Sequence, residues 1–372
     1  VLAEKHTAAT DPILKASLKA QLEELDKEVK AYQHDLIAKN PSTLVASIVN
    51  MSRPVETPDV KKADGTLDSL GTYYQQRTHY WDHVDLTDER IIRMPVFQNK
   101  LEEYMNKVVR QIPDTLNKCA DELIAKLGTS PNPELFKFVV HNITYKYETS
   151  DIMGMDAVFV HMALTYYCPK PGEKSRATWM SDDKLDKMCE RARKLAPLVI
   201  GAKSKNIILT DTTEQRWVNL HTLPNDYVLV VFWDPHCGHC KKELPVLYKD
   251  YVEKLKPAGI EVFSVAKATD STLFADWKKF ICENGFHWVD VGYTWHVFKE
   301  AYTNKNPTAF IPRFTTIESL NYAEIWDVFA TPKFFRIDPD RKIAGKQITA
   351  DQVLDLVTKL RANRKEGKRA TE

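Results

Sequence analysis

Apolar positions spaced three and four residues apart dominate the first half of the chain. They form one stripe over 14–36, and Asp11-Pro12 ahead of it supplies an N-cap followed by proline at the first helical position. The stripe predicts a long helix that ends near Asn40-Pro41, with a packing face or a short coiled-coil contact as its role. Shorter helices in the same spacing are expected at 42–51, 67–80, 95–110, 113–127, 133–148, 154–167 and 181–195.

Beyond about residue 200 the apolar residues gather instead in short runs that are rich in β-branched and aromatic side chains. Turn signals bound these runs, which cover 206–211, 227–233, 261–266, 333–338 and 342–348. Helical spacing lies between or after them, at 240–255, 273–284 and 350–360. Strands that alternate with helices indicate an α/β sandwich around a mixed sheet.

The change of period and the chain breakers predict four parts. The polar segment 52–66 is rich in breakers and is expected to be a loop or linker. It separates a helical connector at 1–52 from an all-helical domain at 53–200. An α/β domain is expected at 201–361, and the polar, basic residues 362–372 are expected to form a flexible tail.

Composition narrows the possible functions. The 52 Lys and Arg residues nearly balance 51 Asp and Glu residues, and no basic block is interleaved with aromatics, so we expect no nucleic-acid partner. The longest apolar run, 227–233, is far shorter than the roughly 20 residues of a membrane helix. Six cysteines in 372 residues do not make a disulfide scaffold. Outside one closely spaced pair we expect the cysteines to be small buried hydrophobic residues, and the scattered histidines of the first half to be structural or on the surface: Cys119, Cys168, Cys189, Cys282, His79, His83, His141 and His161.

The remaining pair, Cys237 and Cys240, lies in VFWDPHCGHCKKELP at 231–245, directly after the most apolar strand and at the start of a helix. Unpaired N–H groups and a positive partial charge at a helix N-terminus stabilise a thiolate. We therefore expect the pKa of Cys237 to lie well below the free value of about 8.5. His236, Gly238 and His239 form the turn around it, and protonatable imidazoles there should favour the thiolate further. Cys240, one helical turn on, is placed to resolve a mixed disulfide.

These residues resemble a known family. Trp233, Cys237-Gly-His-Cys240 and Pro245 resemble the active-site helix of thioredoxin-fold proteins, and CKKELP resembles their envelope branch of TlpA- and ResA-type thiol–disulfide oxidoreductases. The resemblance implies a thioredoxin-like fold at the C-terminus, with Glu243 as the carboxylate that accepts a proton near the cysteines. Trp233 is expected to support the cysteine turn and to be one of the substrate-binding residues.

A second mark of the family lies in ATPKFFRIDPDRKI, where Thr331 and Pro332 match its cis-proline step. The resemblance implies that these two residues face the disulfide and bind the substrate backbone. The segment 294–330 just before them is longer than a minimal thioredoxin connection needs. It is expected either to form a wall of the substrate groove or to be an insertion without contact to substrate.

The chain also departs from the family pattern. Cytosolic-type thioredoxins carry a buried aspartate six residues before the first cysteine, where this chain has Val231, so proton transfer would use Glu243 or water. The CGHC sequence resembles that of protein disulfide isomerases, whereas the surrounding string resembles reductants. The direction of electron flow is therefore open.

The helical half resembles a second family through 79–105 and 153–167. These segments are similar to a helical domain of unknown function that precedes thioredoxin-like domains in envelope proteins of Bacteroides-type bacteria. The resemblance implies a location in the periplasm or cell envelope of a Gram-negative bacterium. It also implies that 36–49 connects to a further N-terminal domain, and it leaves room for a membrane tether outside the given chain.

The sequence supports other functions of the cysteine pair less well. A zinc site needs a second pair of ligands at suitable spacing, and a peroxidase needs a threonine a few residues before one reactive cysteine. A structural Cys237–Cys240 disulfide would close too small a loop to constrain the unfolded chain. The main alternative is a non-catalytic binding protein that uses the fold as a scaffold and the helical domain for partner recognition. We predict an oxidoreductase that acts on protein thiols and disulfides, with an upstream redox partner, and with its own disulfide rather than a metal or organic cofactor as the electron carrier.

Overall fold

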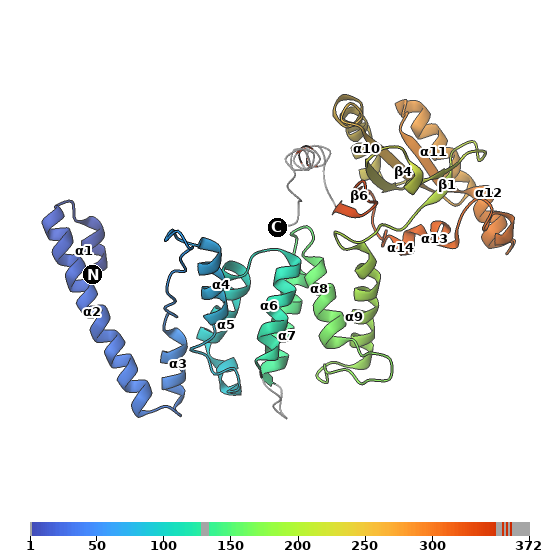
Figure 1. The fold of residues 1–372 in the computed structure, drawn as a ribbon. Helices are drawn as coiled ribbons and strands as arrows, with labels where there is room; N and C mark the ends of the chain where they lie inside the picture. Colours follow the sequence, from blue (N-terminus) through green and yellow to red (C-terminus); the bar gives the residue numbers. More distant parts are fainter. Residues whose placement is uncertain (1, 128–133, 347–351, 353–354, 356–357, 359–372) are drawn as a thin grey trace. The chain divides into compact units, whose positions relative to one another are not determined.

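The computed structural model describes residues 2–127 and 134–346 together with Gln352, Asp355 and Thr358 (Figure 1). The predicted tail at 362–372 and all but three residues of the predicted helix at 350–360 lie outside the described residues. The chain divides into two compact units, Val1–Ile143 and Thr144–Glu372. Helix α7 (Glu134–Glu148) crosses this division, and the domain boundaries expected from the sequence stay predictions.

Helices make up the first unit, as the apolar spacing predicted. Asp11 caps α2 by accepting a hydrogen bond from the Ile13 amide at 2.9 Å, and Pro12 is the first helical residue. In α2 only Leu18 is buried, while Leu14, Leu25 and other members of the stripe stay exposed, so the stripe does not form the expected packing face within the described chain. The unit contains α1 (Leu2–Ala8), α2 (Pro12–Lys39), α3 (Leu44–Ser52), α4 (Ser69–His79), η1 (Glu89–Arg93), α5 (Pro95–Glu103), η2 (Tyr104–Val108) and α6 (Pro113–Ala125).

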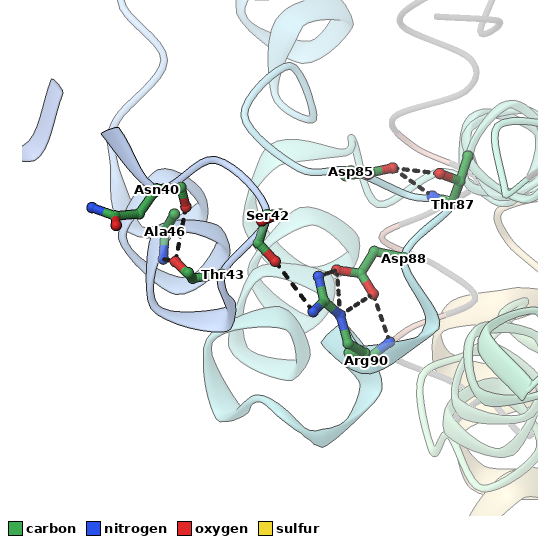
Figure 2. A network of polar contacts seen from close by, with 8 residues as sticks. All are labelled: Asn40, Ser42, Thr43, Ala46, Asp85, Thr87, Asp88 and Arg90. Atoms are coloured by element: carbon green, nitrogen blue, oxygen red, sulfur yellow. Dashed lines mark hydrogen bonds and ion pairs between the residues drawn. The ribbon is translucent and has the colours of Figure 1, made fainter. Parts of the chain in front are cut away.

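A polar network ties the turn between α2 and α3 to η1 (Figure 2). Within the turn, the Thr43 hydroxyl donates to the Asn40 carbonyl at 2.9 Å and accepts from the first turn of α3. Across the unit, Arg90 Nη1 donates to the Ser42 carbonyl at 3.4 Å while its other nitrogens bind the Asp88 carboxylate at 2.7 and 2.8 Å. The Arg90–Asp88 ion pair orients Arg90 toward the turn between α2 and α3.

The helices of the second unit carry a disulfide that the sequence analysis did not foresee. Cys168, just after η3, is bonded to Cys189 in α9, with their Cα atoms 5.6 Å apart. The expectation that both were unpaired small hydrophobic residues is wrong, because α9 packs back along η3 and brings together positions 21 residues apart. These helices are α8 (Asp156–Met162), η3 (Ala163–Tyr167), α9 (Asp182–Leu195) and η4 (Ala196–Leu198).

The rest of the second unit is built on one mixed seven-stranded sheet of order β2-β1-β5-β4-β3-β6-β7. Strands β3, β4 and β5 are parallel, and β6 runs antiparallel to β3. The predicted mixed sheet is confirmed, but β2 and β5 were not predicted. The strands are β1 (Ile208–Thr210), β2 (Trp217–Asn219), β3 (Tyr227–Trp233), β4 (Ile260–Ala268), β5 (Val289–Thr294), β6 (Lys333–Ile337) and β7 (Ile343–Lys346).

Helices cover both faces of this sheet (Figure 1). Side chains of α10 and α11 pack with Trp233 on one face, and those of α12 to α14 pack with Phe232 on the other. The adjacent residues Phe232 and Trp233 thus point into different layers, as successive residues of a strand do. The helical elements are η5 (Leu220–Thr222), α10 (Gly238–Asp250), η6 (Tyr251–Leu255), α11 (Ser271–Asn284), α12 (Trp295–Phe298), η7 (Lys299–Thr303), η8 (Pro307–Ala309), α13 (Ile317–Leu320) and α14 (Tyr322–Ile325). In the part of the chain that the structure describes, no helix is both long and apolar enough to cross a membrane.

Candidate active site at the start of α10

The cysteine pair lies at the junction between the central strand β3 and helix α10. All seven residues of β3 are buried, and Asp234 then builds the turn: its carbonyl accepts from the Cys237 amide at 3.0 Å and its carboxylate accepts from the His236 amide at 2.8 Å. Cys237 caps α10, and its Sγ accepts from the Cys240 amide at 3.4 Å. The sulfur therefore occupies the position where a helix N-terminus stabilises negative charge.

Cys237 is partly exposed, and its pKa is lowered, which is the predicted direction. Burial by itself raises the pKa, but hydrogen bonds from the Thr331 side chain, from Cys240 and from the His239 amide outweigh it. The thiol also donates to the Thr331 carbonyl at 3.2 Å, a contact that favours the protonated form. The donors outweigh this contact, because several of them converge on the sulfur and one acceptor opposes them.

Cys240 differs from Cys237 in both its burial and the direction of its pKa shift. It is fully buried, and burial raises the pKa of its thiol to about 12. Both cysteines are unpaired, so the structure shows the dithiol form. An accessible thiol with a lowered pKa thus stands beside a buried thiol that must lose its proton before it can react.

The predicted cis-proline motif contacts the cysteine motif at Cys237 Sγ. The Thr331–Pro332 peptide bond is cis and directly precedes β6. Its threonine carbonyl is the one that Cys237 contacts. Two segments 94 residues apart in the sequence therefore form one site.

The other predicted residues of the cysteine site differ in their exposure to solvent. Trp233 is 1% exposed, and its Nε1 donates to Ser264 Oγ at 2.8 Å, which suits a support beneath the cysteine turn; contact of its ring with substrate stays a prediction. His236 is exposed and pairs with the Asp276 carboxylate at 2.7 Å. Gly238, His239 and Glu243 are exposed on the first turns of α10, and the roles of His239 in tuning the thiol and of Glu243 in accepting a proton stay predictions.

A carboxylate that the sequence analysis missed lies in the same layer as Cys240. Val231 pairs with Ser264, and Ser264 pairs with Asp290, so the three residues form one row across β3, β4 and β5. Asp290 therefore lies two strands, or about 10 Å, from the position where cytosolic-type thioredoxins carry their aspartate. Its Oδ1 is buried without a hydrogen-bond partner. Burial raises the pKa of Asp290 to about 7, against the lowering effect of hydrogen bonds with Ser264 and Trp288. A lone acidic residue inside the apolar segment VDVGY was the available signal.

Asp290 should make stability depend on pH. Its pKa in the folded protein lies above the ordinary value of about 4, so its contribution to stability is complete at low pH and is lost as the pH rises through about 7. Between pH 5 and pH 8 the free energy of unfolding should fall by about 2–3 kcal/mol from this group. Asp290→Asn should remove that fall, as measured by urea unfolding at both pH values. Asp186→Asn, at an exposed position of α9, is the control. An unchanged pH dependence in Asp290→Asn would show that another group causes it.

Comparisons with known proteins match two parts of the chain. Residues 51–194 match the domain of unknown function DUF5106, and residues 200–346 match the AhpC/TSA family. The AhpC/TSA domain is thioredoxin-like and follows a helical domain, so the predicted fold class and the predicted pair of families are confirmed.

Solved structures from Bacteroides are among the matches. A thioredoxin-like protein from Bacteroides caccae is 15% identical, with a TM-score of 0.50 over 82% of this chain and 99% of that one, which shows the fold. The thioredoxin domain of a thiol-disulfide oxidoreductase from Bacteroides vulgatus is 25% identical, with a TM-score of 0.34, over 44% of this chain and 97% of that chain. A thiol:disulfide interchange protein from Bacteroides sp. is also 25% identical, with a TM-score of 0.34, over 46% of this chain and 97% of that chain. No curated protein matches the chain.

The described residues contain no group of three or more His, Cys, Asp or Glu side chains that could hold a metal ion. The groups that meet at this site are the Cys237 and Cys240 thiols and the Thr331 carbonyl.

Proposed function

We propose that the AhpC/TSA domain is a thiol–disulfide oxidoreductase that exchanges disulfides with envelope proteins through Cys237 and Cys240. The observation that carries this proposal is the asymmetry of the pair beside the cis-proline step. Cys237 is accessible and its pKa is lowered, whereas Cys240 is buried and its pKa is raised to about 12. A nucleophile that reacts first and a partner that reacts second need this difference.

The proposed reaction runs in two exchanges. The Cys237 thiolate attacks one sulfur of a substrate disulfide, the substrate S–S bond breaks, and the other substrate sulfur leaves as a thiolate that takes up a proton. Cys240 then loses its proton to Glu243, directly or through water, and attacks Cys237 Sγ. The Cys237–Cys240 disulfide forms, the second substrate sulfur is released, and the substrate has gained two electrons.

The same residues support the reverse direction and the return of the enzyme. Run backwards, the Cys237–Cys240 disulfide oxidises a substrate dithiol. An upstream redox partner restores the starting form by the same type of exchange. Thr331 and Pro332 hold the substrate backbone beside the sulfurs, and the protein disulfide is the only electron carrier that the cycle requires.

The structural disulfide supports the proposed location in the periplasm or cell envelope. Disulfides persist in oxidising compartments and are rare where thiols are kept reduced. The Cys168–Cys189 bond lies in the helical part of the chain, away from the reactive pair in the sequence. A membrane tether outside the given chain is part of the same proposal.

The reduction potential of the pair tests the proposal. We expect a reversible two-electron couple between Cys237 and Cys240, measured by thiol labelling and mass spectrometry across glutathione buffers. A potential of about −120 to −180 mV would identify a donor or isomerase of disulfides, whereas about −270 mV or lower would identify a reductant. The absence of any reversible couple would contradict the proposal and leave a binding role for the domain.

A further inference from the structure

A pocket of about 1060 Å³ lies within the first unit, in the part of the chain that matches DUF5106. The segment 51–57 forms one side of it, and residues of and next to α4, α5 and η2 form the rest. The volume slightly exceeds the roughly 300–1,000 Å³ of small-ligand sites, so the pocket has room for several residues of a polypeptide.

Three cations line this pocket: Arg53, Lys100 and Lys107. In the part of the chain that the structure describes, none of them forms an ion pair with a carboxylate. Lys100 Nζ lies over the ring of Tyr80 instead, 4.5 Å from the ring centroid, and burial lowers the pKa of Lys100. A partly buried ammonium without an anionic partner has lost some of its hydration, so an incoming carboxylate would form a strong contact with it.

The two carboxylates that line the pocket are held by other groups. The carboxylate of Glu56 accepts a hydrogen bond from Lys30 Nζ at 2.6 Å. The carboxylate of Glu103 accepts one from the Tyr80 hydroxyl at 2.8 Å. The cationic pocket, as we name this site, therefore favours an anionic occupant by charge complementarity.

Aromatic and apolar surface lies beside these charges. Tyr73, Tyr80, Val96 and Val108 line the pocket, and all four side chains are partly exposed. Rings with aliphatic neighbours offer contact area to an apolar side chain. An occupant that carries only carboxylates would leave this surface in contact with water.

The backbone on one side of the pocket is extended and has amides to spare. Along 53–58 partly buried and exposed side chains alternate strictly, with Arg53, Val55 and Thr57 partly buried, and such alternation is typical of extended chain. The amides of Val55, Glu56 and Thr57 form no hydrogen bond with any described residue. Unpaired amides on an extended segment are groups with which a second extended chain can pair.

We propose that the cationic pocket binds an acidic, extended segment of a partner polypeptide. The carboxylates of that segment pair with Lys100 and Lys107, an apolar side chain packs on Tyr73, and the backbone pairs with 55–57. This interaction goes beyond the proposed disulfide exchange, because it gives the helical domain a binding role of its own.

The test measures the binding of two short fluorescein-labelled peptides to the full chain by fluorescence anisotropy. In the glutamate peptide, glutamate alternates with valine around a central phenylalanine; in the glutamine peptide, glutamine replaces every glutamate. We expect the glutamate peptide to bind about 10-fold more tightly in about 50 mM salt, and the difference to shrink in about 1 M salt, where exposed charges are screened. Equal affinities in the low-salt buffer would overturn the proposal.

Lysine variants locate the binding. Lys100→Gln/Lys107→Gln should remove the preference for the glutamate peptide. Lys15→Gln/Lys118→Gln makes the same change of charge at two exposed lysines outside the pocket and should keep the preference. Loss of the preference in both double variants would show that the charge of the whole chain causes it, which would overturn the proposal.

Two competitors identify the kind of occupant. A glutamate peptide with N-methylated backbone amides keeps the charge but cannot pair as an extended chain, and we expect it to bind about 10-fold more weakly. Equal affinity of the N-methylated peptide, or its complete displacement together with the unmodified peptide by inorganic phosphate at an equal concentration, would indicate a site for small anions and overturn the proposal.

The double variant Cys237→Ser/Cys240→Ser separates this proposal from the proposed exchange. It should bind the glutamate peptide as tightly as the unchanged protein, because the cationic pocket contains neither cysteine. Exchange activity without a preference for the glutamate peptide would overturn the pocket alone, whereas the preference without exchange activity would support the pocket and contradict the proposed function.

Discussion

Cys237→Ala is expected to abolish thiol–disulfide exchange, lowering the rate with a disulfide peptide by about 10³-fold or more. Cys237 is the accessible member of the pair and the one whose pKa is lowered, so no other sulfur of the site can make the first attack. The measurement is the initial rate of peptide reduction at neutral pH. Cys282, which was expected to be buried, is exposed and unpaired on α11, and Cys282→Ala should leave the rate unchanged.

The result that would contradict this role is also clear. If Cys237→Ala kept more than a tenth of the wild-type rate while Cys282→Ala lost activity, the nucleophile would be Cys282. The matched pair therefore decides between the helix-capping thiol and an exposed thiol on α11.

Cys240→Ala is expected to stop the reaction after the first exchange and to trap a mixed disulfide at Cys237. Without the buried thiol the intermediate has no internal attacking group, because Cys240 is the residue whose amide contacts Cys237 Sγ. Intact-mass analysis after mixing with one equivalent of peptide should show one covalent adduct that a dithiol reductant releases. Full turnover by Cys240→Ala with a dithiol reductant would show that the resolving role is wrong.

Local signals in the sequence were enough for the elements that hold the cysteines. The unbroken apolar run 227–233 is strand β3 with the same bounds, and the following cysteines begin α10. The cis geometry of Thr331–Pro332 was implied by family resemblance and is present. The strand and the start of the helix depend on neighbours in the sequence, which is why pattern and spacing revealed them.

Features that depend on tertiary structure could not be predicted in this way. Strand β5 interrupts its apolar run with Asp290 and Gly292, and it is a strand because β4 pairs along its whole length. The same pairing places Asp290 in the row of Val231, so the missing aspartate of the family pattern and a half-buried acid two strands away belong to one layer. Phe298 and Tyr302 likewise line one pocket with Phe232 and Thr331, which no spacing in 294–330 encodes.

The Cys168–Cys189 bond is a disulfide that the proposed exchange chemistry would have to leave intact. An attacking thiolate approaches a disulfide along the axis of the S–S bond, so a sulfur that solvent cannot reach is also closed to another protein. Cys168 and Cys189 are both buried, at 9% and 2% exposed. A thiolate of this molecule or of a neighbouring copy therefore cannot attack that bond while the helices around it stay folded. Burial of both sulfurs thus protects the structural disulfide from the proposed exchange.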